Sequence, residues 1–276
     1  MKRFRFGRNW TNYVRHVVNE QVIQEAKNSL VKYLDAGDFK GARFIDIGCG
    51  SGLFSFAALL LDCSRVVSFD FDPECLTALE VLRDRFQHML PGNWQKKWSA
   101  FRGDILDDSL VNKLRESGDI VYSWGVLHHT GNMWKAIENA ASLVASNGAF
   151  IISIYNHAPA SHIWKNIKRF YVDHPWLQPI LGLTFAGYVI TVRMLYHRRL
   201  NLYRERGMHV FYDAIDWMGG YPYEYACFEE IKDFVEKQGF RLVKSPTVIP
   251  CGKGKKPGFW DILNTRYTGC NEFVFR

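Results

Sequence analysis

The sequence lacks closely spaced cysteines, internal repeats and low-complexity tracts, and these absences exclude several classes of protein. Six cysteines are scattered over 276 residues without a C-x-x-C pair: Cys49, Cys63, Cys75, Cys227, Cys251 and Cys270. A zinc knuckle and a dense disulfide framework both need paired cysteines at short spacing, so neither is expected. We therefore expect no metal and predict a reducing, cytoplasmic setting.

The sequence also has little that would target the chain to or across a membrane. The N-terminal stretch MKRFRFGRNWTNYVRH is basic but has no apolar core, so it does not resemble a secretory signal. The stretch from Pro175 to Val192 carries no charge and reaches the lower limit of roughly 18 residues for a membrane span. Its two prolines, two glycines and Gln178 argue against a span.

What the sequence does have is the composition of a packed globular protein. Hydrophobic residues make up 47% of the chain and aromatic residues 15%, which excludes a disordered or fibrous protein. The length fits one large domain, or one domain with a sizeable insertion. The net charge of +7 favours an anionic partner, such as a phosphate, a nucleic acid or a membrane surface, but also suits a mildly basic soluble enzyme.

Short β-branched runs alternate with helical segments up to about residue 156, which is typical of a parallel sheet with crossover helices. Strands are predicted at 43–48, 65–71, 98–103, 119–124 and 148–155, with helices at about 52–61, 73–90, 107–116 and 133–145. Asp72 is a predicted N-cap before Pro73 at a helix start. A helix at 228–238 and a hairpin of strands at 240–249 and 270–276 complete the α/β sheet.

Four segments are predicted along the chain. Residues 1–40 are expected to form an N-terminal helical cap, 41–156 the α/β core, 157–226 a helical lid insertion, and 227–276 a C-terminal helix and hairpin. Between Ser161 and Val210 the lid has eight basic residues against two acidic ones: Lys165, Lys168, Arg169, Arg193, Arg198, Arg199, Arg204 and Arg206. These charges could bind an acidic acceptor or an anionic membrane. Alternatively they solvate helices whose aromatic side chains pack inward, namely Trp164, Phe170, Trp176, Phe185 and Tyr188.

The most informative segment is FIDIGCGSGLF, residues 44–54. Its three alternate glycines, Gly48, Gly50 and Gly52, lie between a predicted strand and a predicted helix, where the backbone can turn sharply and approach a ligand closely. The spacing fits neither the G-x-G-x-x-G of dinucleotide-binding loops nor a G-K-[ST] phosphate loop.

Two further carboxylates follow successive strands. Asp70 ends the second strand, 24 residues after Asp46, where a carboxylate can accept both ribose hydroxyls. Asp104 follows the third strand, where it could take the exocyclic amine of an adenine. Because the carboxyl ends of parallel strands meet at one edge, the two describe a crevice for an adenine nucleoside.

Together, FIDIGCGSG, VVSFDFD, RGDILD and YSWGVLHHT resemble the successive motifs of class I S-adenosylmethionine-dependent methyltransferases, over roughly residues 40–156. The resemblance implies a Rossmann-like sheet of seven strands with the last antiparallel, and S-adenosylmethionine as cofactor. The glycine loop would pass the methionine part, Asp70 would hold the ribose and Asp104 the adenine. The cofactor-binding residues expected on this basis are Asp46, Gly48, Cys49, Gly50, Gly52, Leu53, Asp70, Phe71, Gly103, Asp104, Ile105, Trp124 and Gly125. Trp10 and Tyr13 of the N-terminal segment could also lie near the sulfonium, although packing of an N-terminal helix explains them equally well.

Methyl transfer is an in-line displacement, so catalysis mostly requires an aligned acceptor, with a base if the acceptor is a hydroxyl. His128 and His129 follow the fourth strand and are the candidate bases. The VLHH sequence is similar to that of ubiquinone-biosynthesis-type and sugar or natural-product O-methyltransferases. Candidate acceptor-binding residues are His157, Tyr212, Asp213, Asp216 and Tyr223.

The sequence therefore predicts O-methylation of a small metabolite, sugar or glycan intermediate. A lipid-linked, polyprenyl phenol-like acceptor at a membrane is the first alternative, because the uncharged stretch at 175–192 has basic flanks. Nucleic acid is a less favoured substrate, because Ser123-Trp124-Gly125-Val126 lacks the Asn/Asp-Pro-Pro-aromatic motif of amino-methylating enzymes. A non-catalytic cofactor-binding interaction module is the remaining alternative, and the oligomeric state is not indicated.

Overall fold

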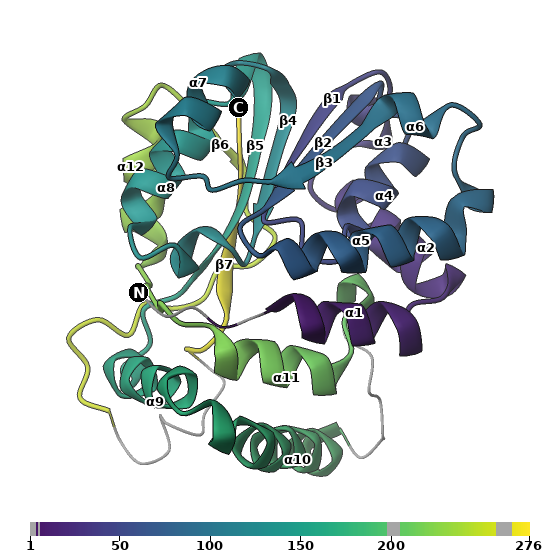
Figure 1. Ribbon diagram of the computed structural model, residues 1–276. Coiled ribbons are helices and arrows are strands. Elements are labelled where there is room, and N and C mark those ends of the chain that lie inside the picture. The colour runs from purple at the N-terminus through teal and green to yellow at the C-terminus, as the bar shows by residue number, and fades with distance from the viewer. Residues whose placement is uncertain (1–3, 5, 198–204, 258–266) are drawn as a thin grey trace.

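The computed structural model describes residues 4, 6–197, 205–257 and 267–276, and its core is a seven-stranded sheet (Figure 1). The strand order is β3-β2-β1-β4-β5-β7-β6. The strands are β1 (Arg43–Ile47), β2 (Arg65–Asp70), β3 (Trp98–Arg102), β4 (Gly118–Trp124), β5 (Val144–Tyr155), β6 (Leu242–Lys244) and β7 (Cys270–Phe275). The first five pair in parallel, whereas β7 is antiparallel to both β5 and β6. This confirms the predicted α/β sheet with its antiparallel last strand and C-terminal hairpin.

Helices cover both faces of the sheet (Figure 1). On one face, α4 (Leu53–Leu60) and α5 (Pro73–Phe86) pack on alternate strand residues such as Phe44. On the other face, α7 (Asp108–Leu114), α8 (Met133–Ala141) and α12 (Phe228–Glu236) pack on the residues between, such as Ile45. Single turns or short helices occur at η1 (Gln87–Met89), α6 (Trp94–Lys97) and η2 (Leu127–His129). The predicted cap of α5 is present, because the Asp72 side chain accepts a hydrogen bond from the Glu74 amide.

The N-terminal segment forms α1 (Phe6–His16), α2 (Glu20–Val31) and the short α3 (Ala36–Phe39). Helix α1 lies along α5 so closely that a Cβ at Gly7 would be 2.3 Å from the Glu74 backbone. The Gly7 amide also donates to Asp72 at 3.0 Å. This contact fixes α1 across the carboxyl edge of the sheet.

The insertion after β5 forms α9 (Ser161–Asp173), η3 (Pro175–Leu177), α10 (Gln178–His197), η4 (Glu205–Gly207) and α11 (Val210–Gly219). Helix α11 lies beside α1, and α10 is the outermost layer (Figure 1). Trp164 and Phe185 pack inward against Trp217. The other three aromatic residues for which inward packing was considered are exposed: Phe170 by 49%, Trp176 by 73% and Tyr188 by 39%. Of these three, Tyr188 lies on α10, whereas Phe170 lies on α9 and Trp176 on η3.

The lid's basic residues do not all lie on its surface. Lys168 is fully buried, with its ammonium 3.7 Å from the Trp217 ring centroid and donating to the Trp217 carbonyl. Burial lowers the pKa of Lys168 well below its usual value. Arg198, Arg199 and Arg204 lie outside the described residues. The charge available at the described surface is therefore smaller than the sequence suggested.

A disulfide that the sequence did not predict joins Cys227, at the start of α12, to Cys251 in the loop after β6. The Cα atoms are 5.2 Å apart. The other cysteines are free thiols, and Cys49, Cys63 and Cys75 are buried. The disulfide links the N-terminus of α12, where the insertion ends, to the loop after β6.

Candidate active site

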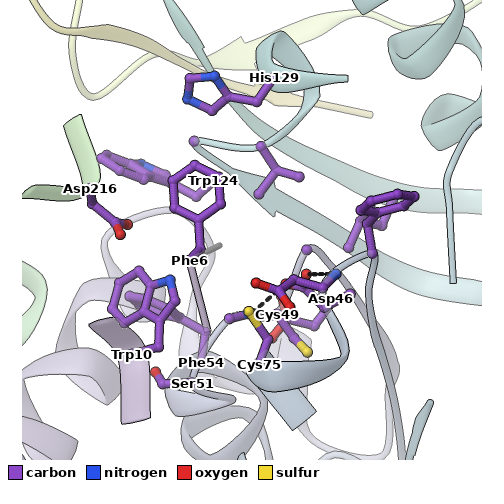
Figure 2. A pocket seen from close by; sticks show the side chains of 18 of the residues that line it. Phe6, Trp10, Asp46, Cys49, Ser51, Phe54, Cys75, Trp124, His129 and Asp216 are labelled. Carbon is purple, nitrogen blue, oxygen red and sulfur yellow. Dashed lines mark hydrogen bonds between the residues drawn. The ribbon is translucent and has the colours of Figure 1, made fainter. Parts of the chain in front are cut away.

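A cavity of about 310 Å³ opens at the carboxyl edge of the sheet, beneath α1 and α11. Its walls come from four separate parts of the chain: the N-terminal helix, the strand ends, the lid and the start of β7. Figure 2 shows the rings of Phe6, Trp10 and Trp124 gathered between His129 and the glycine loop, with Asp216 at one side. The cavity is therefore largely aromatic, with a few carboxylates and one imidazole at its margins.

The glycine loop presents bare backbone to this cavity. Gly48 and Gly50 have φ values of +68° and +53°, in the left-handed region that disfavours other residues. A Cβ at Gly50 would lie 3.3 Å from the Trp10 indole, and one at Gly48 would lie 2.4 Å from the Val126 side chain. Side chains at these positions would fill the space that a ligand needs.

Asp70 is oriented by the loop it faces. One carboxylate oxygen accepts from the Gly50 amide and the other from the Asp72 amide, each at 2.9 Å. The Cys75 thiol also hydrogen-bonds to this carboxylate. A carboxylate has about four acceptor positions, so Asp70 can still accept a ribose hydroxyl. Burial raises the pKa of Asp70 to about 6, although the two backbone hydrogen bonds oppose the shift.

The walls beyond Asp70 suit a purine ring. Phe71 is 42% exposed and Ile105 is buried, and both line the cavity beside Asp104. The Asp104 carboxylate accepts from the Leu106 amide at 3.0 Å, which orients it at the cavity edge. Apolar walls with a fixed carboxylate at each end fit an adenosyl group.

Asp46 lies one residue before the end of β1, close to the glycine loop, and also lines the cavity. It is 3% exposed and accepts a hydrogen bond from the Ser55 hydroxyl. Burial raises the pKa of Asp46 to about 7.

The two adjacent histidines differ in what their rings can do. His129 lines the cavity, and its Nδ1 lies 2.7 Å from the Pro222 carbonyl. A carbonyl only accepts, so Nδ1 carries the proton and Nε2 is left as an acceptor. Burial lowers the pKa of His129 to about 3, so the ring is neutral at physiological pH. His129 therefore has the tautomer that a proton acceptor needs.

His128 has the opposite tautomer. The Tyr155 amide donates to its Nδ1 at 3.2 Å, so the ring proton is on Nε2. The side chain is fully buried, lies outside the cavity lining, and its Nε2 has no hydrogen-bond partner in the described part of the chain. The prediction that His128 could act as the base is therefore wrong, because its basic nitrogen is already occupied.

Helix α11 supplies the wall opposite the sheet. Asp213, Asp216 and Trp217 line the cavity from this helix. Asn9 of α1 donates to Asp216 at 3.0 Å and so joins the N-terminal helix to the lid. Burial raises the pKa of Asp216 to about 8. Near neutral pH this carboxyl group is therefore largely protonated.

Most of the predicted site residues line the cavity. In addition to His128, five predicted residues do not line it: Gly52, Tyr13, His157, Tyr212 and Tyr223. Gly52 packs the helix start, because a Cβ there would be 2.7 Å from Leu79. Tyr13 is fully buried and donates to the Gly207 carbonyl.

Two of the other three outliers, Tyr212 and Tyr223, pack against aromatic rings, and His157 lies near the disulfide. Tyr212 packs edge-on against Tyr13, with ring centroids 5.8 Å apart, and Tyr223 is buried beside Tyr155. His157 lies beside Cys227 and Glu230, with the possible ligand atoms of all three within 4.8 Å of one another. Cys227, however, is already bonded to Cys251.

The sequence reasoning missed several cavity residues. Phe54 directly follows the glycine loop, and Tyr155 ends β5 at the same edge of the sheet, so position alone could have indicated both. Phe4, Phe6, Met208 and Tyr221 carry no such signal. Arg206 was counted only as one of many lid charges, yet it lines the cavity.

The profile of a family described as "Methyltransferase domain" matches residues 18–215. The ribosomal protein L11 methyltransferase of Methylococcus capsulatus is 34% identical over 129 residues, which cover 43% of this chain and 43% of that protein. The corresponding protein of Marinomonas sp. is 33% identical over 156 residues, covering 56% and 49%. The chain thus spans about half the length of the curated relatives it matches.

Solved structures share the fold at low identity. The magnesium protoporphyrin IX methyltransferase of Synechocystis with bound SAH superposes with a TM-score of 0.51 at 16% identity, over 94% of this chain and 87% of that chain. An O-methyltransferase family protein of Burkholderia thailandensis gives 0.51 at 14% identity, over 93% and 57%. The predicted class I methyltransferase fold is therefore confirmed.

Proposed function

The chain belongs to the family of methyltransferase domains, and on that premise we propose that it transfers a methyl group from S-adenosylmethionine to a hydroxyl group. The proposed acceptor is a small metabolite, sugar or glycan intermediate held between His129 and α11. The single observation that carries this proposal is the neutral His129 ring, whose Nδ1 is fixed on Pro222 and whose Nε2 is left as an acceptor at the cavity wall.

Bound in the cavity, S-adenosylmethionine would supply the electrophilic methyl group. Asp70 would accept the ribose hydroxyls and Asp104 would lie at the adenine end. The rings of Trp10, Phe6 and Trp124 would surround the sulfonium, whose positive charge an aromatic face attracts. These residues would bind and orient the donor.

His129 would remove the acceptor proton. As the acceptor oxygen approaches the methyl group, its proton would pass to Nε2 and the positive charge would be shared with the hydrogen bond to Pro222. General-base assistance of this kind contributes roughly 10² to 10⁴ in rate.

The test is a search for methylated products. The enzyme and S-adenosylmethionine carrying a trideuterated methyl group are added to aqueous and lipid fractions of a cell extract, and mass spectrometry identifies species that gain the label. A labelled hydroxyl compound that disappears with His129→Asn supports the proposal. A labelled amine or a labelled protein such as a ribosomal subunit would contradict the proposed acceptor class.

One observation favours a second candidate, a lipid-linked acceptor at an anionic membrane surface. The segment Pro175–Val192 is long and apolar enough for a membrane span by length and composition, and only 11% of it is buried. The outward face of α10 carries Ile180, Leu183, Tyr188 and Val192, which are 37–62% exposed, without a charged residue before Arg193. A solvated helix face normally carries charges.

In the sequence, basic residues precede and follow the segment that carries this apolar face. Lys165 and Arg169 are exposed on α9, and Arg193, Arg198 and Arg199 follow in the sequence. Apolar helices with basic flanks and interfacial aromatic residues are typical of helices lying in the plane of a membrane. The exposed Trp176 fits this pattern.

Sedimentation with vesicles tests this second candidate. We expect the protein to sediment with phosphatidylglycerol-containing vesicles at low salt, and Leu183→Glu to abolish this without lowering thermal stability. Lys135→Glu, on the exposed part of α8, is the matched control. No association with vesicles, or a dimer in analytical ultracentrifugation that Leu183→Glu dissociates, would overturn it.

A further inference from the structure

Arg206 lies in an unusual position for a lid residue. It belongs to η4 and has a φ of +70°, in the left-handed region, immediately before Gly207. Its guanidinium stacks between the Trp124 ring, 3.5 Å from the centroid, and the Phe54 ring, 4.5 Å away. One nitrogen, Nη2, donates to the Tyr122 hydroxyl at 2.6 Å. Three residues from two elements of the core, β4 and α4, therefore hold this side chain in one orientation.

Despite this close packing, the guanidinium is not satisfied. Its Nε and Nη1 atoms are buried and have no hydrogen-bond partner in the described part of the chain. Arginine stays charged at all physiological pH values, and buried donors without acceptors are costly. An acceptor that binds here would remove that cost.

The nearby carboxyl groups of Asp46 and Glu272 do not accept a hydrogen bond from Nε or Nη1 of Arg206. Asp46 accepts from Ser55. Glu272 accepts from Trp124 at 2.8 Å, from Tyr33 at 2.9 Å and from Thr247 at 3.0 Å. The remaining donors of Arg206 are therefore available to a ligand, and a carboxylate is the acceptor that matches a guanidinium best.

The position of Arg206 in the cavity indicates which half of the cofactor would lie beside it. Phe54 directly follows the glycine loop and Trp124 ends β4, whereas the ribose and adenine positions lie at the ends of β2 and β3. Arg206 is also the one lysine or arginine among the described residues that line the cavity. With the adenosyl group at the ends of β2 and β3, the amino-acid half of the cofactor, which terminates in an α-carboxylate, would lie toward Phe54 and Trp124.

We propose that Arg206 binds the α-carboxylate of the cofactor's methionine half. This rests on the proposed function, since it takes S-adenosylmethionine as the occupant of the cavity. A residue of the insertion then completes the cofactor site of the core. Arg206 is consequently a determinant of affinity for cofactors that keep the amino-acid group.

Two ligands separate this contact from the rest of the site. S-adenosylhomocysteine has the carboxylate, whereas 5′-methylthioadenosine has the same adenosyl thioether without the amino-acid group. Calorimetry is carried out with both ligands on the wild-type protein, Arg206→Gln and Arg206→Lys. Arg169→Gln, an exposed lid variant, is the matched control.

We expect Arg206→Gln to weaken S-adenosylhomocysteine binding by about 10- to 100-fold, the loss typical of one charge-assisted contact. Binding of 5′-methylthioadenosine should change by no more than about two-fold. Arg206→Lys should recover part of the affinity, because it restores the charge without the planar fork. Arg169→Gln should bind both ligands like the wild type.

Each other result overturns the assignment in a distinguishable way. Equal weakening of both ligands would make Arg206 a structural support, and thermal unfolding of the free variant would show the damage. Unchanged binding of both ligands would place the carboxylate elsewhere, and a raised acceptor KM would then assign Arg206 to the acceptor. If the wild-type protein binds neither ligand, the proposed cofactor itself is wrong.

Discussion

Replacing His129 with asparagine tests the proposed base with little change to its surroundings. The asparagine amide can still donate to the Pro222 carbonyl, as Nδ1 does at 2.7 Å, but the chain loses the Nε2 acceptor. The neighbouring variant His128→Asn is the control, because its amide oxygen can still accept from the Tyr155 amide. The two substitutions remove the same atoms from adjacent residues with opposite tautomers.

The structure sets the size of the expected effect. Burial lowers the pKa of His129 to about 3, so the imidazole is a weak base and its contribution should lie at the low end of the usual range. We expect His129→Asn to lower kcat by about 100-fold. The Kd for S-adenosylhomocysteine should stay within about two-fold, because no cofactor contact is removed. His128→Asn should change kcat by only a few-fold, with some loss of stability from the buried site.

The assay measures S-adenosylhomocysteine release with the acceptor found in the labelling search, across pH 5 to 8. A histidine whose pKa is lowered to about 3 is neutral over this whole range, so kcat should show no loss of activity near pH 6.5. Three results would refute the reasoning: a kcat within a few-fold of wild type in His129→Asn, a larger loss in His128→Asn, or a clear titration near 6.5.

Three further predictions concern the cofactor loop and the lid. Asp70→Asn should weaken both S-adenosylhomocysteine and 5′-methylthioadenosine by about 10- to 100-fold in calorimetry, because both ligands keep the ribose. In the wild type, affinity should fall as the pH drops through about 6, where the Asp70 carboxylate becomes protonated, and Asp70→Asn should remove this dependence. Gly50→Ala should lower cofactor affinity and cost about 1–2 kcal/mol of stability in urea unfolding, because φ is +53° and Trp10 lies 3.3 Å from the new Cβ. Burial raises the folded-state pKa of Asp216 to about 8, so the folded protein holds a proton that the unfolded chain loses near pH 4, and the unfolding free energy should decrease as pH rises from 4 to 8. Asp216→Asn should therefore raise the unfolding free energy by about 1 kcal/mol at pH 8 and leave it unchanged at pH 4. The increase is limited because this half-buried group is partly screened by solvent.

The sheet and the cofactor crevice could be predicted because their determinants are local in the sequence. Gly48 and Gly50 permit the left-handed backbone that the loop adopts. Asp70 ends one strand and Asp104 follows another, and both strands have a pattern that is visible in the sequence. Parallel strands bring their carboxyl ends to one edge, so these residues had to meet. The predicted strands are present, and they differ from the observed ones in where they begin and end; β6, for example, covers Leu242–Lys244 and is shorter than the predicted strand at 240–249.

Only the tertiary structure decided the roles of the residues that depend on distant partners. His128 and His129 are adjacent, yet Tyr155 fixes one tautomer and Pro222 the other, and both partners are distant in the sequence. Lys168 and Arg206 are both basic residues of the insertion, but one is buried under Trp217 and the other stacks on Trp124 in the cavity. Charge and periodicity are properties of a segment, whereas desolvation and hydrogen-bond partners belong to the packed chain. The sequence by itself therefore determined the sheet and the cofactor loop, and the packing of α1 and α11 over that loop decided which side chains can act there.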